Sequence, residues 1–520
     1  MTNQLPYLIK ENFKMIPFVE IILPYIKSVT NSFGSELSPR VKDKLVNKLL
    51  KELSLLAEVS LQLELDNFIK NGNTNFDEFT EKMILSLATD YPVLDKLFRI
   101  KTGNFSSYIH NIITSFHKDI KNIESTFKLN DIQIIDVDIS LGDGHNGEGT
   151  ALVYLSDGTK LIYKPRNIGV TNSYNSFIDW INLKLKTDLK IFKVLDYEDY
   201  GWIEFVAYEE VKSEEDLQEY YHKAGILLAV TLLLGSKDYH YENIIASGKN
   251  PVMIDHETII QPFFSNKSFR SWDDQFKIPP FSVLESFLIV NPDTEAPLDI
   301  VGYGVSGNIE VTELEKIVVN PNTINSKRIT RFTTRKIIDK NIPISEGDYV
   351  FVNGYKEYFI NGFSTAYDTF LNSKEELKSV NSPLKLFGNH EVRYVWRPTF
   401  IYFKILKYMR GASFMSSFEA YQSKLYELMS KAYQKENLKS YRLILECEMK
   451  QMLNGDIPFF NLNSLDCHLE EDKSFKIFTY NCIENMNHRV NILSKHHKNE
   501  QLEYIIKWLN IKKFSSYSIT

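Results

Sequence analysis

The sequence predicts an α+β protein with two lobes, in which a small lobe built on a mixed or antiparallel sheet is flanked along the chain by helical regions. In the first 125 residues, apolar side chains recur at spacings of three and four, the period of amphipathic helices. Near residue 130 the pattern changes to short strand-like runs, and after residue 385 helical patterns return. With 520 residues, the chain is long enough for several such parts.

Residues 1–128 are expected to form a helical region. Ser38 and Pro39 provide a capping hydroxyl followed by a proline at the first helical position. The apolar stripe of the helix that begins there consists of Val41, Leu45, Leu49, Leu53 and Leu56. A second helical pattern, over 79–125, is broken at Tyr91-Pro92. No catalytic pattern is visible here, so packing or peptide docking is the expected role.

Residues 129–212 are expected to form the small lobe, with strands at 132–139, 151–155 and 160–164. A glycine-rich segment lies between the first two strands, and its glycines are Gly142, Gly144 and Gly147. A G-x-G-x-x-G pattern between two strands argues against a dinucleotide fold, which places it between a strand and a helix. It favours a loop that folds over ATP phosphates.

Three ionisable residues accompany this segment. Lys164 follows Gly147 by seventeen residues on the third strand, a position that suits a lysine binding nucleotide phosphates. Asp143 and His145 lie inside the glycine-rich segment itself. They either do acid–base or orienting work beside an anionic site, or Asp143 only caps the turn.

Residues 213–261 are expected to carry the catalytic and metal-binding loops. A buried helix over 217–234 leads into Asp238, which is followed five residues later by Asn243. Asp255 comes twelve residues after Asn243, at the end of an apolar run. In phosphoryl transfer, one Asp orients the attacking hydroxyl, an Asn holds magnesium, and a second Asp holds the magnesium that bridges the phosphates. The alternative is a polar turn between a helix and a strand.

The spacing of these residues matches the catalytic loop of protein kinases. The D-F-G triplet of kinases is replaced here by Asp255-His256-Glu257, and His240 gives the loop the D-x-H-x-x-N form of lipid-kinase-like enzymes. A helix over 172–187 occupies the place where kinases carry the carboxylate that pairs with the lysine, and Asp179 is the nearest candidate. A strand over 200–206 leads towards a hinge.

The remaining chain divides into an inserted subdomain over 262–385, with strands at 333–338 and 348–352, and a helical region over 386–520. Arg393 and Arg397 are four residues apart, so a helix would place both on one face, where they could grip phosphate or simply form surface salt bridges. The pairs Cys467-His468 and Cys482…His488 lack a C-x-x-C partner, so no zinc site is expected.

Composition excludes several classes of protein. The net charge is −7 and there is no basic block, so no nucleic-acid partner is expected. Three cysteines argue against a disulfide framework and favour a reducing cytoplasm. The longest apolar runs, such as 226–234, fall far short of about 20 residues, so no transmembrane segment is expected.

The motifs together resemble the dehydratase domain of class II lanthipeptide synthetases. The motifs that carry the resemblance are Gly142-Asp143-x-His145-Asn-Gly, Leu161-Ile-Tyr-Lys164-Pro-Arg166, Tyr200-Gly-Trp-x-Glu204-Phe, Asp238-x-His240-x-x-Asn243 with Ile-Ala-x-Gly248, Ile254-Asp255-x-Glu257-Thr258, Arg393-x-x-x-Arg397-Pro-Thr399 and Gly455-Asp-Ile-Pro-Phe. They occur in family order and, with the weaker helical flanks, cover nearly the whole chain.

The resemblance implies a lipid-kinase-like fold with helical additions and a kinase-activation-like insert. It implies an enzyme that phosphorylates Ser and Thr of a precursor peptide with ATP and Mg²⁺, and then eliminates the phosphate to leave dehydroalanine or dehydrobutyrine. The nucleotide-binding positions implied are Gly142, Gly144, Gly147, Lys164 and Arg166. The phosphorylation residues implied are Asp238 and His240, with Asn243, Asp255 and Glu257 at the metal. The elimination residues implied are Asp143, His145, Arg393 and Thr399; whether Asp143 or His145 moves the proton stays open.

One feature departs from the family. Full-length members continue into a zinc-dependent cyclase domain, and this chain ends at Thr520 without such a cysteine–histidine set. No ring formation by this chain is expected. The expected partners are a precursor peptide with its leader, and beyond it a separate cyclase and an export transporter. Two other functions stay open: a peptide or small-molecule kinase without elimination, and a pseudokinase-like binding module.

Overall fold

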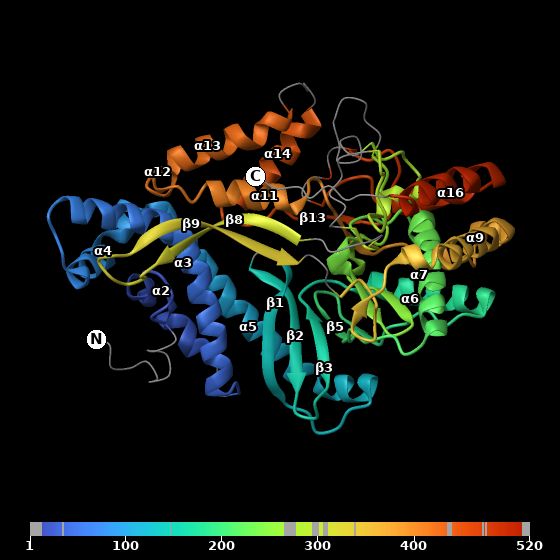
Figure 1. Cartoon of the computed structure of the whole chain (residues 1–520), viewed down its shortest axis with the longest axis horizontal. Coiled ribbons are helices and arrows are strands. Elements are labelled where there is room, and N and C mark those ends of the chain that lie inside the picture. The colour runs from blue at the N-terminus through green and yellow to red at the C-terminus, as the bar shows by residue number, and fades with distance from the viewer. Residues whose placement is uncertain are drawn as a thin grey trace. The chain divides into compact units, whose positions relative to one another are not determined.

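The computed structural model describes residues 13–33, 36–145, 147–264, 277–293, 301–304, 310–336, 340–433, 439–470, 473 and 476–511. Within these residues the chain combines long helices with small sheets (Figure 1), which confirms the predicted α+β class. It divides into two compact units, each assembled from segments that are far apart in the sequence. The first unit is Met1–Pro165, Leu314–Thr333 and Thr399–Pro458, and the second is Arg166–Glu313, Thr334–Pro398 and Phe459–Thr520.

Within the described residues the first unit begins with four helices, in the region that the sequence predicted to be helical. They are α2 (Val19–Ser32), α3 (Pro39–Lys70), α4 (Phe76–Asp90) and α5 (Pro92–Phe127), coloured blue in Figure 1. The Ser38 hydroxyl accepts a hydrogen bond from the Val41 amide and caps α3. The predicted break at Tyr91-Pro92 separates α4 from α5. Later helices of the same unit are α11 (Thr399–Tyr408), α12 (Ala412–Met415), α13 (Phe418–Ser430) and α14 (Lys439–Met452).

The three strands predicted for the small lobe are present in the first unit. They are β1 (Ile134–His145), β2 (Glu148–Leu155) and β3 (Lys160–Lys164), paired antiparallel in chain order. β1 extends to His145, which pairs with Glu148 of β2. The glycine-rich segment, expected to be a loop between two strands, therefore lies at the end of the β1–β2 hairpin. Gly158 has φ +88°, and the Asp157 carboxylate accepts from the Thr159 amide, which makes the predicted turn between β2 and β3.

The second unit packs around two long helices, α7 (Glu214–Leu234) and α9 (Lys356–Asn372). A side chain at Gly225 would come within 2.0 Å of the Phe359 carbonyl, and one at Gly362 within 1.9 Å of the His222 carbonyl. Only glycine therefore allows the two helices to approach this closely. Nearly every residue of α7 from Ala224 onward is buried, which confirms the predicted buried helix.

The other elements of the second unit surround this pair. Its helices are α6 (Gly169–Leu185), α10 (Lys374–Lys378), α15 (Cys482–Ile492) and α16 (Lys495–Leu509). Its antiparallel strand pairs are β4 (Val194–Asp196) with β5 (Gly201–Glu204), β6 (Ile244–Ser247) with β7 (Asn250–Met253), β10 (Ile344–Ser345) with β11 (Asp348–Tyr349), and β12 (Glu391–Tyr394) with β13 (Phe460–Asn463).

The region expected to be an inserted subdomain contains the strand pair β8 (Glu310–Val319) and β9 (Lys327–Lys336). The predicted strand at 333–338 overlaps the end of β9, and residues 337–339 lie outside the described residues. The predicted strand at 348–352 is shorter, because β11 ends at Tyr349 and Val352 begins a turn of 3₁₀-helix. The five domains given above, with the four boundaries between them, remain a prediction. Among the described helices, none has the length and apolar content needed to cross a bilayer.

Candidate active site in the second unit

The predicted catalytic loop follows directly from the end of α7. Gly235 ends the helix with φ +72°, and a side chain there would lie 2.8 Å from Nε of Arg489. Asp238 also has a left-handed backbone, with φ +65°. The side-chain amide of Asn243 donates to the backbone carbonyl of Asp238 over 2.8 Å. This hydrogen bond closes the loop and directs the Asn243 oxygen, Oδ1, away from the Asp238 carbonyl.

The strand pair β6–β7 brings the third predicted residue to this loop. Ile244 pairs with Met253, and the amide of Ile254 donates to the Asn243 carbonyl over 2.9 Å. Asp255 is the next residue, and its φ of +62° turns the chain out of the strand. The β6–β7 hairpin therefore places Asp255 beside the Asn243 end of the loop.

Further hydrogen bonds join the segments that flank the loop and Asp255. The Lys237 amide donates to the Thr258 carbonyl, and the Thr258 hydroxyl donates to the Lys237 carbonyl. The Ser236 hydroxyl donates to the Ile259 carbonyl over 2.5 Å. Hydrogen bonds therefore hold segments 236–238 and 255–259 together, although these segments are separated along the chain.

His240 caps the short helix Tyr241–Asn243. Its Nδ1 accepts from the Glu242 amide over 3.3 Å, so the proton of the neutral ring lies on Nε2. Nε2 is 3.9 Å from Oδ1 of Asp238. At this distance the ring lies beside the Asp238 carboxylate but makes no direct hydrogen bond to it.

Glu257 binds two arginines. Oε1 accepts from Nη1 of Arg393 over 2.5 Å, and Oε2 accepts from Nη1 of Arg166 over 2.6 Å. Both guanidinium groups stack on the ring of Phe459, with Cζ at 4.8 Å from the ring centroid for Arg166 and 5.2 Å for Arg393. The family resemblance implied that Glu257 binds the metal, that Arg166 binds the nucleotide and that Arg393 acts in elimination. In the second unit these three side chains are direct neighbours.

The charges of this cluster act on each other. Burial raises the pKa of Asp238 above the ordinary carboxyl value, while His240 and Arg393 oppose the rise. The Asp238 side chain keeps 34% of its accessible surface. The rise in its pKa therefore comes from the protein atoms packed around a carboxylate that is still partly open to solvent. Burial alone would lower the pKa of Arg393, but nearby carboxylates, chiefly Glu257 and Asp238, outweigh it and raise the pKa.

His256 fixes the position of the triplet that replaces D-F-G. Its buried ring stacks on Tyr174 of α6 at 4.1 Å between centroids and meets Phe192 edge-on at 5.2 Å. Nε2 lies 3.2 Å from the Met253 carbonyl, which can only accept, so Nε2 carries the proton and Nδ1 accepts from the Thr171 hydroxyl. The sequence did not single out His256, although an aromatic ring at the middle position of this triplet was the available signal.

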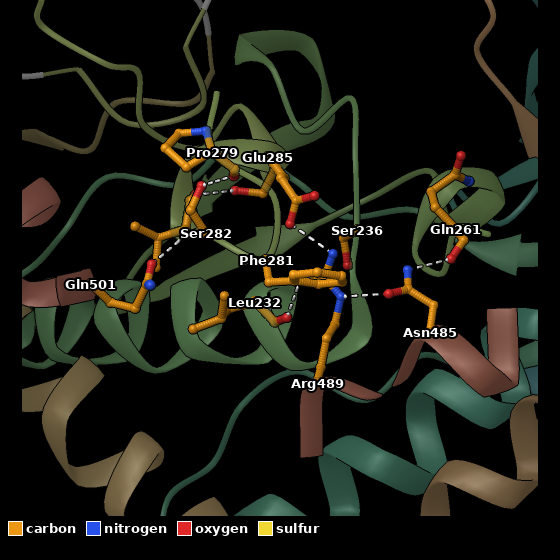
Figure 2. A network of polar contacts seen from close by, with 12 residues as sticks. Leu232, Ser236, Gln261, Pro279, Phe281, Ser282, Glu285, Asn485, Arg489 and Gln501 are labelled. Atoms are coloured by element: carbon orange, nitrogen blue, oxygen red, sulfur yellow. Dashed lines mark hydrogen bonds and ion pairs between the residues drawn. The ribbon is translucent and has the colours of Figure 1, made fainter. Parts of the chain in front are cut away.

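A buried polar network connects several segments of the second unit. Asn485 donates to the Gln261 carbonyl, and Arg489 donates to Oδ1 of Asn485 (Figure 2). Gln261 in turn donates to the Arg393 carbonyl. Arg489 also binds Glu285 over 2.7 Å and the Leu232 carbonyl at the end of α7 over 2.9 Å. The network thus ties strand β12, which carries Arg393, to the helix that leads into Asp238.

The expected helical face shared by Arg393 and Arg397 is wrong. Arg393 lies in β12, where it pairs with Asn461 of β13, and not on a helix with Arg397. Arg397 follows in a bend before α11. The two arginines therefore do not share a helical face, because pairing with a strand about 70 residues away overrides the local spacing. Asp179, on α6, is exposed and lies outside the buried face of that helix.

The remaining predicted residues belong to the first unit. His145 is buried at the end of β1, and its Nδ1 is 2.9 Å from the Ile457 carbonyl. A carbonyl only accepts, so Nδ1 carries the proton and Nε2 holds the lone pair of the neutral ring. Lys164, at the end of β3, is also buried. Thr399 is the first residue of α11.

The backbone of the glycine-rich segment runs along the end of β1. Gly142, Asp143 and Gly144 lie in β1, and Gly147 follows with φ +75°. Asn146 lies outside the described residues, and so does the side chain of Asp143. The cysteine–histidine pairs have ordinary neighbours: the Cys467 thiol faces Glu484 at 3.9 Å, and His488 stacks on Phe281 and Tyr480.

The residues of the second unit fit a magnesium ion bound with a nucleotide. Mg²⁺ prefers oxygen ligands and commonly uses one or two protein side chains together with phosphates and water. Asn243 Oδ1 is the amide atom left after Nδ2 binds the Asp238 carbonyl, and Asp255 adjoins it through the β6–β7 hairpin. Among the described residues, no three His, Cys, Asp or Glu side chains form a metal cluster, and this chemistry does not require one.

Comparison with known proteins shows the family of this chain. A curated protein of Lactococcus lactis subsp. lactis, described as Lacticin 481/lactococcin biosynthesis protein LcnDR2, is 24% identical over 398 residues. The match covers 74% of this chain and 42% of that protein, so the chain spans less than half the length of this relative. A family model described as "Domain of unknown function (DUF4135)" matches residues 91–463, well over half of the chain. The chain therefore belongs to the DUF4135 family.

Proposed function

We propose that this chain is a peptide Ser/Thr dehydratase of lanthipeptide biosynthesis, built on a lipid-kinase-like core. It phosphorylates Ser and Thr of a ribosomal precursor peptide with ATP and then eliminates the phosphate to give dehydroalanine or dehydrobutyrine. The observation that carries the proposal is the closed loop from Asp238 to Asn243, joined through the β6–β7 hairpin to Asp255. Similarity to the lactococcal relative, which is described as a lacticin 481/lactococcin biosynthesis protein, supports a role in lanthipeptide biosynthesis.

In the phosphorylation step, Asp238 orients the hydroxyl of the peptide and accepts its proton. His240 lies beside the Asp238 carboxylate, with Nε2 at 3.9 Å from Oδ1, and opposes the rise of the Asp238 pKa. Asn243 Oδ1 and Asp255 would hold Mg²⁺, and Lys164 with the β1–β2 hairpin would bind nucleotide phosphates. When bound, ATP would supply the phosphoryl group and Mg²⁺ would neutralise the charge that develops on it.

In the elimination step, Nε2 of His145 removes the α-proton of the phosphorylated residue. The electrons of the broken C–H bond form the Cα=Cβ double bond, and the Cβ–O bond breaks so that phosphate leaves with its electron pair. Arg393 stabilises the leaving phosphate, and Thr399 and Asp143 assist this step. The Ile457 carbonyl supports the role of His145, because it holds the proton on Nδ1 and leaves the lone pair on Nε2. A positioned base contributes about 10²–10⁴-fold, so charge stabilisation of the leaving group must supply much of the rest.

The proposal includes a precursor peptide with its leader as substrate and the cytoplasm as the place of reaction. A separate cyclase and an export transporter act on the product.

The test is intact-mass spectrometry of a precursor peptide encoded beside the gene, incubated with the purified chain, ATP and Mg²⁺. A loss of about 18 Da per modified residue is the expected result, because phosphate gained is then eliminated. A gain of about 80 Da that never converts would instead identify a peptide kinase without elimination. An unmodified peptide would leave neither function standing.

A further inference from the structure

The Glu257 carboxylate occupies a site that is built for a larger anion. Each of its oxygens accepts from a different guanidinium group, Arg393 on Oε1 and Arg166 on Oε2. The two arginine side chains retain only 8% and 21% of their accessible surface. Two arginines that each donate to one oxygen of the same anion form the arrangement by which proteins bind phosphate.

Phe459 holds this pair of arginines in position. Both guanidinium carbons lie over its ring, at 4.8 and 5.2 Å from the centroid. A ring that contacts both cations keeps the two forks side by side against their mutual repulsion. Phe459 is the last residue of the Gly455-Asp-Ile-Pro-Phe motif, to which the resemblance gave no catalytic or binding role.

The charge of the pair favours phosphate over a carboxylate. Two guanidinium groups carry two positive charges, and Glu257, the carboxylate that binds both of them, carries a single negative charge. A phosphate monoester carries close to two negative charges at neutral pH and offers three acceptor oxygens. A phosphorylated residue therefore satisfies the pair better than Glu257 does.

We propose that Arg166 acts together with Arg393 to bind the phosphate of the phosphorylated Ser or Thr during elimination. Glu257 keeps the pair in place until that phosphate arrives, and Phe459 is a positioning residue for both guanidinium groups. This inference rests on the proposed dehydratase function. It extends that function, because the resemblance gave elimination to Arg393 and placed Arg166 with the nucleotide. As the Cβ–O bond breaks, its electron pair passes to the phosphate oxygen, and the two arginines balance the added charge.

The experiment separates the two half-reactions. A synthetic phosphoserine form of the precursor peptide is supplied with MgADP, and loss of phosphoric acid is followed by mass. The same variants are then given unmodified peptide with ATP, and the rate of phosphate gain plus dehydration is measured. The variants are Arg166→Lys, which keeps the charge but loses the fork, and Phe459→Leu, which keeps an apolar side chain but loses the aromatic face. Phe459→Tyr is the conservative rescue.

Arg166→Lys and Phe459→Leu should slow elimination by about 10–100-fold, the usual cost of removing a residue that orients a ligand group. The KM for the phosphopeptide should rise, and the KM for ATP and the rate of phosphorylation should change far less than the rate of elimination. Phosphopeptide should accumulate from unmodified peptide, and Phe459→Tyr should restore elimination. Arg99→Lys is the matched control, because Arg99 also pairs with a carboxylate, Asp95, and stacks on a ring, Tyr25, but lies in α5.

Three results would overturn the inference. Elimination at the wild-type rate in Arg166→Lys would remove Arg166 from the step. A higher KM for ATP without a change in elimination would return Arg166 to the nucleotide. Equal losses in both half-reactions, with a lowered melting temperature, would make Phe459 only structural. If the wild-type chain itself never dehydrates the peptide, the proposed function and this inference fall together, whereas wild-type dehydration with unaffected variants sinks the inference alone.

Discussion

The side-chain amide of Asn243 donates a 2.8 Å hydrogen bond to the backbone carbonyl of Asp238. The last residue of the loop therefore holds the first, and the amide nitrogen is committed to the protein. Its oxygen is the atom that remains for a cation. One side chain thus combines a structural donor with a candidate metal ligand, and substitutions can separate these two roles.

Asn243→Ala removes both the donor and the oxygen, and we expect phosphorylation to fall by about 100-fold, the upper end of what metal-site residues contribute. Asn243→Asp keeps an oxygen ligand but sets a carboxylate against the Asp238 carbonyl, so a smaller loss of activity with a higher KM for ATP is expected. Initial rates of phosphate gain by the peptide, measured across Mg²⁺ concentrations, check this. Equal activity in Asn243→Ala and the wild type would exclude Asn243 from the site.

His145→Gln should let phosphopeptide build up, because glutamine keeps a polar side chain of similar length but has no basic nitrogen to remove the α-proton. Elimination is expected to fall by about 10²–10⁴-fold, the range of a general base. The measurement is the ratio of phosphorylated to dehydrated product over time. His117→Gln on α5, whose side chain is 53% exposed, is the matched control and should behave as the wild type. Full dehydration by His145→Gln would make Asp143 the better candidate for the base.

Acid should destabilise the second unit through Asp188. Burial alone would raise the pKa of this carboxyl group, but hydrogen bonds from Lys223 and Lys249 outweigh it and lower the pKa to about 2. A carboxyl group with a lowered folded-state pKa stabilises the protein above its unfolded pKa, near 3.8, and loses this contribution as pH falls towards about 2. Lys223 is fully buried and also binds Asn250 at the β6–β7 turn.

The measurement is the urea midpoint of the wild type and of Asp188→Asn at several pH values. The variant should be less stable at pH 6, and the difference should shrink as pH falls below about 4, because the wild-type carboxylate is then protonated as well. A constant difference across this range would show that Asp188 contributes by packing and not by charge.

Among the contacts shown in Figure 2, the buried ion pair of Arg489 and Glu285 should contribute most to the free energy of unfolding. Arg489→Met leaves the Glu285 carboxylate buried without its cation, which should lower the free energy of unfolding by about 3–5 kcal/mol. The double variant Arg489→Met/Glu285→Leu should recover part of this loss. Urea unfolding measures both. Arg442→Ala removes an ion pair whose arginine is 82% exposed and should cost less than about 1 kcal/mol.

Several elements were predictable because their signals are local. The Ser38 cap, the break at Tyr91-Pro92 and the turn at Asp157-Gly158 each depend on residues within four positions of one another. The strands β1–β3 and the buried helix α7 follow from the period of their apolar residues. The spacing from Asp238 to Asn243 likewise fits inside one loop, and the sequence could single it out.

The surroundings of Arg393 and Glu257 could not be read in this way. The Arg393-x-x-x-Arg397 spacing suggested a helix, but pairing of β12 with β13 makes Arg393 part of a strand. Glu257 reads as a metal ligand beside Asp255, and the fold surrounds it with Arg166, Arg393 and the Phe459 ring.

By itself, the sequence determined the α+β class and the helices and strands with regular apolar periods, and it singled out a candidate phosphoryl-transfer loop. The tertiary structure decided which charged groups meet and which atoms they present. Asn485 reaches Gln261, and Ile457 reaches His145, across more than 200 residues of chain. Spacing reports neighbours only within a helix, a strand or a turn, whereas tautomers, ion-pair partners and metal-facing oxygens depend on groups that folding brings from distant segments.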